Sequence, residues 1–210
     1  MPSLPAHGII GSVTSTPLTP LSRMRDWLRE QPTLTGSGRA IDDGALPGDP
    51  GALFVSWIRA AAEAGVAEPH AATLATVGAD GVPDARTLIL KDLDERGWAF
   101  AGPRSSGKGV QLAAHSAAAL NFWWQPLVRA VRVRGAVREA PAAESAADLA
   151  ARSTAAREGV APRDWVLWRL QPTRVEFWQG AVDRRHTRIV YDAQDGGWSL
   201  SVSGATTSTE

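Results

Sequence analysis

Residues 86–91, Arg-Thr-Leu-Ile-Leu-Lys, combine an unbroken apolar run with a cation at each end. The run of Leu, Ile and Leu predicts a buried strand. The two terminal cations need an explanation, because charges are not buried without partners. Either Arg86 and Lys91 extend from the strand ends into water, or they bind an anion at the edge of the strand. Since side chains alternate along a strand, these two cations start on opposite faces.

Short apolar runs separated by turn residues flank this segment on both sides. A Gly-Ala-Asp-Gly sequence at 78–81 predicts a hairpin turn directly before it. Residues 92–97 and 162–168 are expected to form a turn and a connector. We expect strands at 71–77, 83–90, 98–101, 117–124, 128–139, 170–179, 187–191 and 198–202. Several strands at this close spacing indicate an antiparallel barrel or sandwich.

Four stretches carry helical signals around this β-rich centre. Asp49 and Pro50 form a helix start, with Asp as N-cap and Pro at the first helical position, and this helix ends near Gly65. The other helices are expected at 22–30, 108–115 and 140–160. We therefore expect a mobile N-terminal tail with a short helix, then one β-rich domain, then a frayed C-terminus, at 1–48, 49–202 and 203–210.

The composition is that of a globular protein and argues against several kinds of site. The 210 residues suffice for one domain with a sizeable core. Acidic and basic residues number 22 each, which argues against a nucleic-acid or membrane surface driven by bulk charge. With no Cys and four scattered His, we expect no metal site. No membrane span or secretory signal is evident, so the expected compartment is the cytoplasm.

Five segments, in this order and spacing, resemble the FMN-dependent pyridoxamine 5′-phosphate oxidases. They lie at 49–61, 68–91, 94–100, 105–112 and 175–191. The last segment is the most specific, with Glu-Phe-Trp-Gln-Gly in a strand followed by Arg-x-His-x-Arg. The resemblance implies a mainly β fold with flanking helices, the split antiparallel β-barrel that binds FMN. It also implies a homodimer with FMN in clefts at the subunit interface.

The resemblance assigns one set of residues to the cofactor. The phosphate dianion of FMN needs cations and hydrogen-bond donors that converge on it. Ser106 and Lys108 match phosphate contacts at a helix start, although alone they describe a capped surface turn. Trp178 matches a residue that packs on the flavin, although a lone Trp in a strand more often belongs to the core. The full set of implied cofactor contacts is Arg86, Thr87, Leu88, Lys91, Ser106, Lys108, Gln111, Trp178 and Arg188.

A second set of residues is assigned to the substrate, a pyridoxine or pyridoxamine phosphate. The match implies substrate contacts from Lys91, Arg152, Arg184 and His186, with Arg184 and His186 as the catalytic residues. Outside this context, His186 is also explained as a solvated strand-end residue. The implied reaction moves a hydride from the substrate carbon that bears the amine or hydroxyl to flavin N5. Dioxygen then reoxidises the flavin.

The chain departs from the family pattern around the implied cofactor. Gly107 stands where an Arg is usual, so one phosphate cation is missing. Ala130 stands where a Gln is usual, and Ala101-Gly102 replaces an aromatic residue and a Thr. Each loss removes on the order of 1–3 kcal/mol of binding where a partner group is left unpaired.

Further departures lie around the implied substrate. Asp148 and Ala156 replace the Tyr and Ser expected near Arg152, and an acidic group there would repel a substrate phosphate. The stretch between Arg152 and the last strands is also much shorter than usual. Three functions stay open: an FMN-dependent oxidase of vitamin B6 phosphates, a paralogue that oxidises another substrate such as a phenazine-type metabolite, or a non-catalytic flavin- or ligand-binding dimer.

Overall fold

The structure, a computed structural model, describes residues 23–38, 41 and 43–204. The chain divides into two units, Met1–Thr33 and Leu34–Glu210. The described part of the first unit contains helix α1 (Met24–Glu30). The helix start expected at Ser22, the tail before it and the last six residues of the chain lie outside the described residues. No helix in the described part of the chain is long and apolar enough to cross a bilayer.

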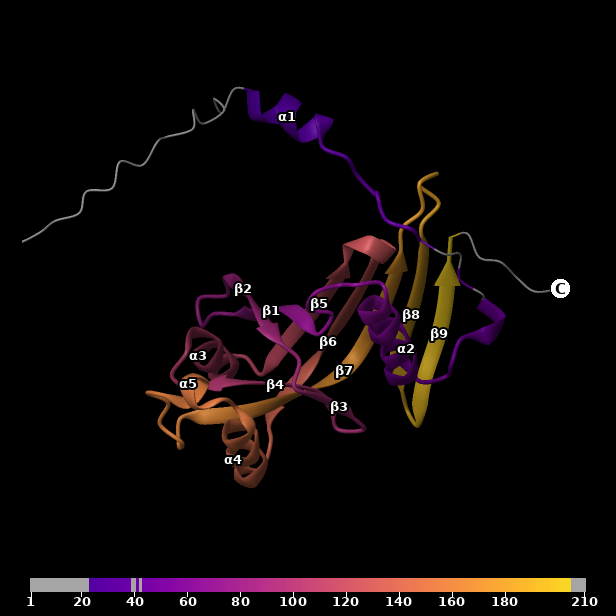
Figure 1. The fold of residues 1–210 in the computed structure, drawn as a ribbon. Coiled ribbons are helices and arrows are strands. Elements are labelled where there is room, and N and C mark those ends of the chain that lie inside the picture. The colour runs from indigo at the N-terminus through magenta and orange to yellow at the C-terminus, as the bar shows by residue number, and fades with distance from the viewer. Residues whose placement is uncertain (1–22, 39–40, 42, 205–210) are drawn as a thin grey trace, which may run out of the picture. The chain divides into compact units, whose positions relative to one another are not determined.

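The second unit is built on one nine-stranded antiparallel sheet with short helices around it (Figure 1). The strands are β1 (Ala71–Val77), β2 (Pro83–Ile89), β3 (Asp92–Asp94), β4 (Gly97–Pro103), β5 (Ala117–Trp124), β6 (Arg129–Glu139), β7 (Trp165–Gln179), β8 (Thr187–Gln194) and β9 (Gly197–Ser203). The helices are η2 (Asp43–Ala45), α2 (Pro50–Glu63), α3 (Gly107–Ala114), η3 (Gln125–Leu127), α4 (Ala142–Ala151) and α5 (Thr154–Arg157).

The sheet closes on itself as a split barrel. Its strands follow the order β2-β1-β5-β6-β7-β4-β3, and only Leu90 and Lys91 separate β2 from β3 in sequence. The two ends of the path are therefore consecutive parts of one chain, and the Lys91 N–H donates to the Ala99 carbonyl of β4 at 2.8 Å. The long strand β7 pairs with β4 through its first half and with β8 through its second half. The expected split antiparallel β-barrel is confirmed.

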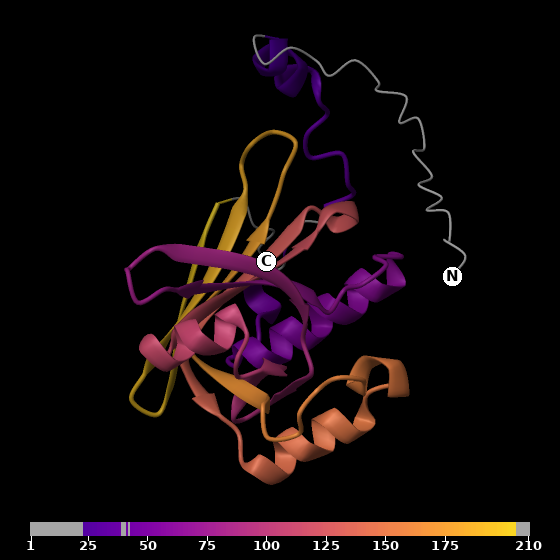
Figure 2. The same cartoon turned by 90° about the vertical axis from the view of Figure 1, so that its left-hand side faces the viewer.

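Helix α2 covers one side of the barrel and supplies much of its core (Figure 2). Asp49 caps the helix as the sequence predicts, because its carboxylate accepts from the Ala52 N–H at 2.8 Å. Phe54 packs on Phe122 of β5 with ring centroids 4.8 Å apart, and Trp57 packs on the ring of a β7 phenylalanine. Each fully buried side chain of this size contributes about 1.5–3 kcal/mol to folding.

The structure differs from the sequence prediction at three places. The connector predicted at 162–168 is wrong, because β7 begins at Trp165 and six consecutive residues there are buried. Burial on both faces removes the alternation that reveals a strand. The turn expected at 92–97 contains the short strand β3. The helix predicted at 140–160 is two helices, because Ser153 starts a new one by accepting a backbone N–H at 3.3 Å.

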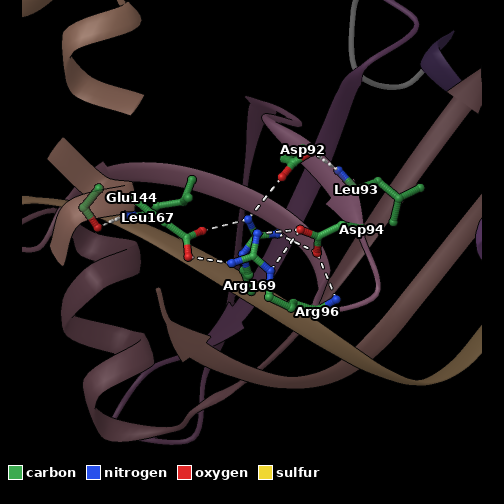
Figure 3. A network of polar contacts seen from close by, with 8 residues as sticks. Asp92, Leu93, Asp94, Arg96, Glu144, Leu167 and Arg169 are labelled. Atoms are coloured by element: carbon green, nitrogen blue, oxygen red, sulfur yellow. Dashed lines mark hydrogen bonds and ion pairs between the residues drawn. The ribbon is translucent and has the colours of Figure 1, made fainter. Parts of the chain in front are cut away.

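A network of charged side chains ties α4 to the barrel (Figure 3). At its centre is Arg169 of β7, whose side chain is 7% exposed. Its guanidinium contacts Asp92 at 3.1 Å, Asp94 at 2.9 Å and Glu144 of α4 at 2.9 Å. Arg96, in the turn between β3 and β4, also contacts Asp94 and Glu144, at 2.6 and 2.5 Å. The buried Arg169 charge is thus balanced by three carboxylates.

Candidate functional site

A group of polar residues from β1, β2 and the start of α3 gathers at one end of the barrel. Four of its members match the implied cofactor contacts, and two were not singled out from the sequence. We call this group the cationic cluster; it consists of Thr76, Asp84, Arg86, Ser106, Lys108 and Gln111. The register between β1 and β2 places Arg86 beside Leu74, so its side chain starts on the face that forms the barrel core.

Hydrogen bonds hold the guanidinium of Arg86 in one position. It donates to the Thr76 hydroxyl, to the Asp84 carboxylate at 2.6 Å and to the Gln111 side-chain carbonyl at 2.8 Å. The Gln111 amide in turn donates to Asp84 at 3.1 Å. These bonds lower the pKa of Asp84, chiefly through Gln111, then through the Ala85 N–H and the Arg86 charge. Arg86 is therefore oriented before any ligand is present.

The first turn of α3 brings a second cation to the same place. Ser106 is the N-cap, where its hydroxyl accepts from the Gly109 N–H at 3.4 Å and donates to the Pro103 carbonyl at 2.6 Å. The Lys108 ammonium lies 3.4 Å from this hydroxyl and is partly buried. Its pKa is lowered, first by burial and then by the charge of Arg86. Among the described residues, no carboxylate lies within ion-pair distance of Lys108.

The remaining implied contacts on β2 and just after it are not part of this cluster. Thr87 is exposed, and its register partner is Thr73. Leu88 is partly buried and packs against the hydrophobic core. Lys91 is exposed, and within the described part of the chain its side chain makes no hydrogen bond or ion pair. The structure thus brings Arg86 and Lys108 together and leaves Lys91 apart from them.

A second group lies at the other end of the sheet, around the turn between β7 and β8. We call it the indole cluster; it consists of Trp178, Arg184, His186 and Arg188. These residues line a cavity of about 510 Å³ together with Arg185, Ser203 and Gly204. The Trp178 and His186 rings lie 4.8 Å apart, and Trp123 of β5 lies 6.2 Å from Trp178. The structure brings together these two implied cofactor contacts, Trp178 and Arg188, and the two implied catalytic residues, Arg184 and His186.

Local hydrogen bonds orient the side chains of the indole cluster. The Ala181 N–H donates to Nδ1 of His186 at 3.0 Å, so Nε2 is the ring nitrogen that can carry a proton toward a ligand. Arg184 has a positive φ of 66°, and its N–H closes the turn onto the Ala181 carbonyl at 3.0 Å. Arg188 lies 3.6 Å from the buried carboxylate of Glu176. The cluster is thus preorganised by the turn and by β7.

The two clusters lie on different strands and on opposite faces of the sheet. In one direction β2 is connected to β7 and β8 through β1, β5 and β6, and in the other it continues into β3, which is connected to β7 through β4. Leu74, the register partner of Arg86, is connected by strand pairing to the buried Val175 of β7. Trp178 follows Val175 by three residues and therefore points to the other face. In Figure 1, β2 and α3 lie on the left and β8 lies on the right.

Arg152, the remaining implied substrate contact, belongs to neither cluster. It follows α4, and its guanidinium stacks on the Trp165 ring at 4.5 Å from the ring centroid. Its Nε also donates to the Ala156 carbonyl at 3.3 Å. The Trp165 indole N–H donates to Asp148 at 2.8 Å, so Trp165 contacts both the Arg152 cation and the Asp148 carboxylate. Arg152 thereby contributes to packing at the start of β7.

Sequence reasoning missed two polar residues of the cationic cluster, Thr76 and Asp84, and the carboxylate of Glu176 beside the indole cluster. Asp84 and Arg86 are two positions apart on a strand, which places them on one face, and this spacing was the available signal. Thr76 and Glu176 carry no such signal, because their partners come from distant segments. Glu176 is buried and joins Arg188 to Arg132 of β6, which it contacts at 2.9 Å.

Two family models match this chain over most of the barrel. The model described as pyridoxamine 5′-phosphate oxidase matches residues 58–179, which is more than half of the chain. The model described as the pyridoxine 5′-phosphate oxidase C-terminal dimerisation region matches residues 165–202. The fold and these matches define a split-barrel protein whose residues 165–202 match the dimerisation region of the family.

Relatives and solved structures agree with this family. The chain is 38% identical to a pyridoxine/pyridoxamine 5′-phosphate oxidase of Thermosynechococcus vestitus, over 71% of this chain and 86% of the relative. It is 39% identical to one of Cupriavidus metallidurans, over 77% and 91% of the two chains. PhzG from Burkholderia lata, solved with tetrahydrophenazine-1-carboxylic acid, superposes with a TM-score of 0.73 at 25% identity, covering 81% of this chain and all of PhzG. This chain belongs to the pyridoxamine 5′-phosphate oxidase family.

Proposed function

We propose that this protein is an FMN-dependent oxidoreductase of the pyridoxamine 5′-phosphate oxidase type. The observation that carries the proposal is the ammonium of Lys108, which is partly buried beside the Arg86 guanidinium and lacks a carboxylate partner in the described part of the chain. Placing two cations together in a partly desolvated site is unfavourable unless an anion joins them. A phosphate dianion at the N-terminus of α3 fits this arrangement.

Each cluster has a separate task in this proposal. Arg86 and Lys108 bind the phosphate, while Thr76, Asp84 and Gln111 keep the Arg86 guanidinium oriented. In the indole cluster, Trp178 and Arg188 border the ring system of the cofactor. When bound, FMN supplies the hydride acceptor and passes the electrons on to dioxygen.

We propose that the protein acts as a homodimer with each FMN shared between two copies. The cationic and indole clusters lie on opposite faces of the sheet, so one chain alone does not offer both to the same ligand. In a dimer, one copy would supply the cationic cluster and the other copy the indole cluster to the same FMN. The match to a dimerisation region at 165–202 supports this arrangement, and so does Trp123, which is 48% exposed beside the indole cluster.

The proposed substrate is a pyridoxamine or pyridoxine phosphate, supported by the names of the curated relatives. Arg184 and His186 would orient the substrate in the cavity, with Nε2–H of His186 placed to donate a hydrogen bond. Lys91 and Arg152 are further proposed contacts. Excluding water from the reacting carbon would be the task of the Trp178 and His186 rings.

A second candidate is an oxidase of a larger aromatic substrate without a phosphate. The geometry around Trp165 favours it, because Arg152 is stacked on this ring and Asp148 is bonded to it. A carboxylate there weakens the attraction for a substrate phosphate. The similarity to PhzG, which was solved with a phenazine derivative, also supports this candidate.

The absorption spectrum of the purified protein tests the proposed function. We expect flavin absorption in the sample, or quenching of flavin fluorescence when FMN is added to colourless protein. Adding pyridoxamine phosphate without oxygen should then bleach the flavin, and readmitting oxygen should release hydrogen peroxide. A colourless protein that leaves FMN fluorescence unchanged would contradict the proposal. Bleaching by an aromatic substrate alone would select the second candidate.

One pair of variants separates an oxidase from a non-catalytic binder. In an oxidase, His186→Ala should lower the rate of bleaching at least about tenfold while FMN stays bound, because only the substrate side is changed. His70→Ala is the matched control, because His70 is exposed and is not among the residues that line the cavity of the indole cluster. A wild-type protein that binds FMN but is bleached by none of the tested substrates would favour the binder.

A further inference from the structure

A cavity of about 800 Å³ lies on the barrel where helix α2 begins. Its walls come from the first turns of α2, the turn between β3 and β4, the middle of β7 and the start of β9. No member of the cationic cluster or of the indole cluster lines it. The cavity is therefore separate from the site of the proposed oxidase reaction.

Two indoles form apolar walls of this cavity. Trp98 of β4 is 3% exposed and packs edge-on against Phe54 of α2, with ring centroids 5.9 Å apart. Its buried indole N–H has no acceptor in the described part of the chain, so the protein leaves a polar group unpaired in this wall. Trp198 of β9 is partly buried, and Val55 of α2 is 37% exposed. Indole faces attract cations as well as apolar groups.

Acidic groups outnumber cations around the cavity. Its charged lining residues are Asp49, Asp94, Glu95 and Arg96. Arg96 is already paired, with Asp94 at 2.6 Å and with Glu144 of α4 at 2.5 Å (Figure 3). Within the described residues, the Glu95 side chain makes no hydrogen bond or ion pair, and Asp49 contacts no cation. The cavity thus has two carboxylates whose charge no described cation balances.

The N-terminus of α2 does not make this cavity an anion site. A helix start attracts anions through its free N–H groups. Here Pro50 has no N–H, and the Asp49 carboxylate accepts from the Ala52 N–H at 2.8 Å. The cap therefore already supplies a negative charge to the helix start, and the remaining charge of the cavity is acidic.

We propose that this cavity binds an organic cation, an ammonium group carried on an aromatic or alkyl body. The ammonium lies near the carboxylates of Asp49 and Glu95, and the body packs against the indoles of Trp98 and Trp198. The carboxylates attract the charge, while the indoles attract both parts of the ligand. This inference does not rest on the proposed function, because the cavity shares no residue with either cluster.

Three probes that share one body and differ in charge test the proposal. They are phenylbutylammonium, phenylbutanol and phenylbutyrate, titrated by calorimetry into the full-length protein at physiological ionic strength. We expect the ammonium to bind at least about fivefold more tightly than the alcohol, because ion pairs of this kind contribute up to about 1 kcal/mol. The carboxylate should bind most weakly. Equal affinity for the three probes, or tightest binding of the carboxylate, would overturn the inference.

Two lysine substitutions on α2 locate the bound cation. Val55 lines the cavity, whereas Ser56 is exposed beside it and does not line the cavity. Val55→Lys should weaken ammonium binding at least about fivefold by repulsion and should strengthen binding of the carboxylate probe. Ser56→Lys adds the same charge to the same helix and should change neither affinity by more than about twofold, because an exposed charge outside the cavity is screened. Equal effects of the two variants would place the cation outside this cavity.

A third variant tests the unbalanced carboxylate itself. Glu95→Gln removes the charge and keeps the shape, so ammonium binding should weaken about two- to fivefold while alcohol binding stays unchanged. Because Glu95 is exposed, the variant should unfold near the wild-type temperature. Wild-type affinity of Glu95→Gln for the ammonium would contradict the assigned contact. A protein that binds the ammonium probe but no flavin would refute the proposed function and leave this inference standing.

Discussion

Two cations beside strand β4 differ in how the protein balances their charge. Arg169 pairs in register with Ala99 of β4, is buried, and contacts Asp92, Asp94 and Glu144 (Figure 3). Lys108 lies over Gly102 of the same strand, is partly buried, and has no carboxylate partner in the described part of the chain. The charge of Arg169 is balanced by carboxylates of the protein, whereas the charge of Lys108 is not.

This difference distinguishes a structural cation from a binding cation. A buried charge needs partners, and Arg169 has them in three carboxylates from β3 and α4. Lys108 has a lowered pKa because burial and the Arg86 charge both disfavour its charged form. A phosphate would reverse this effect, and we propose that it binds at this unmatched cation.

The largest expected effect is on stability, when the matched cation is removed. Arg169→Met should lower the free energy of unfolding by about 3–5 kcal/mol, because it leaves three carboxylates without their central partner. Arg96→Met removes a cation of the same network that is 53% exposed, and should cost about 0–1 kcal/mol. Urea denaturation of both variants provides the measurement. Equal losses for the two variants would contradict the central role of the buried Arg169 in this network.

Removing the unmatched cation should change ligand binding instead of stability. Lys108→Met should raise the Kd for FMN about ten- to a hundred-fold, since a charge-assisted hydrogen bond contributes about 1.5–3 kcal/mol. Its riboflavin affinity and its unfolding free energy should stay close to wild type. Fluorescence titrations with both flavins check this prediction. A loss of stability comparable to that of Arg169→Met would show that Lys108 is a structural residue.

The smallest expected effect comes from adding a cation next to Lys108. Gly107→Arg places a guanidinium in open space at the start of α3, where the family usually has an Arg. An exposed charge contributes about 0.2–1 kcal/mol, so FMN affinity should rise up to about fivefold at low salt. The gain should disappear in high salt, because exposed charges are screened. An unchanged FMN affinity at low salt would place the phosphate away from this turn.

Much of the barrel was predictable because its strands alternate or are bounded by turns. Strands β1 and β5 lie where the sequence predicts them, and Asp49 caps α2 as expected. The first half of β7 was missed, since Trp165 and the five residues after it are all buried and show no alternation. A segment without alternation cannot be recognised as a strand from the sequence alone.

The candidate site was predictable in its residues but not in its arrangement. The resemblance identified Arg86 and Lys108, and the structure places them in one cluster. The bonds from Arg86 to Thr76 and Gln111 depend on the β1–β2 register and on the position of α3. The separation of Arg86 from Trp178 depends on the order of strands in the sheet, which local sequence patterns do not contain.

Whether Lys108 is a binding cation can be measured through the pKa of its ammonium by NMR. The chain contains two lysines, Lys91 and Lys108, so lysine-selective labelling gives two signals, and Lys108→Met identifies the second. We expect a Lys108 pKa below its ordinary value of 10.5 in the free protein. This pKa should rise when FMN binds, but not when riboflavin binds. FMN affinity should fall as the pH increases through the Lys108 pKa, because the ammonium then loses its charge. A Lys108 pKa that FMN leaves unchanged would contradict the claim.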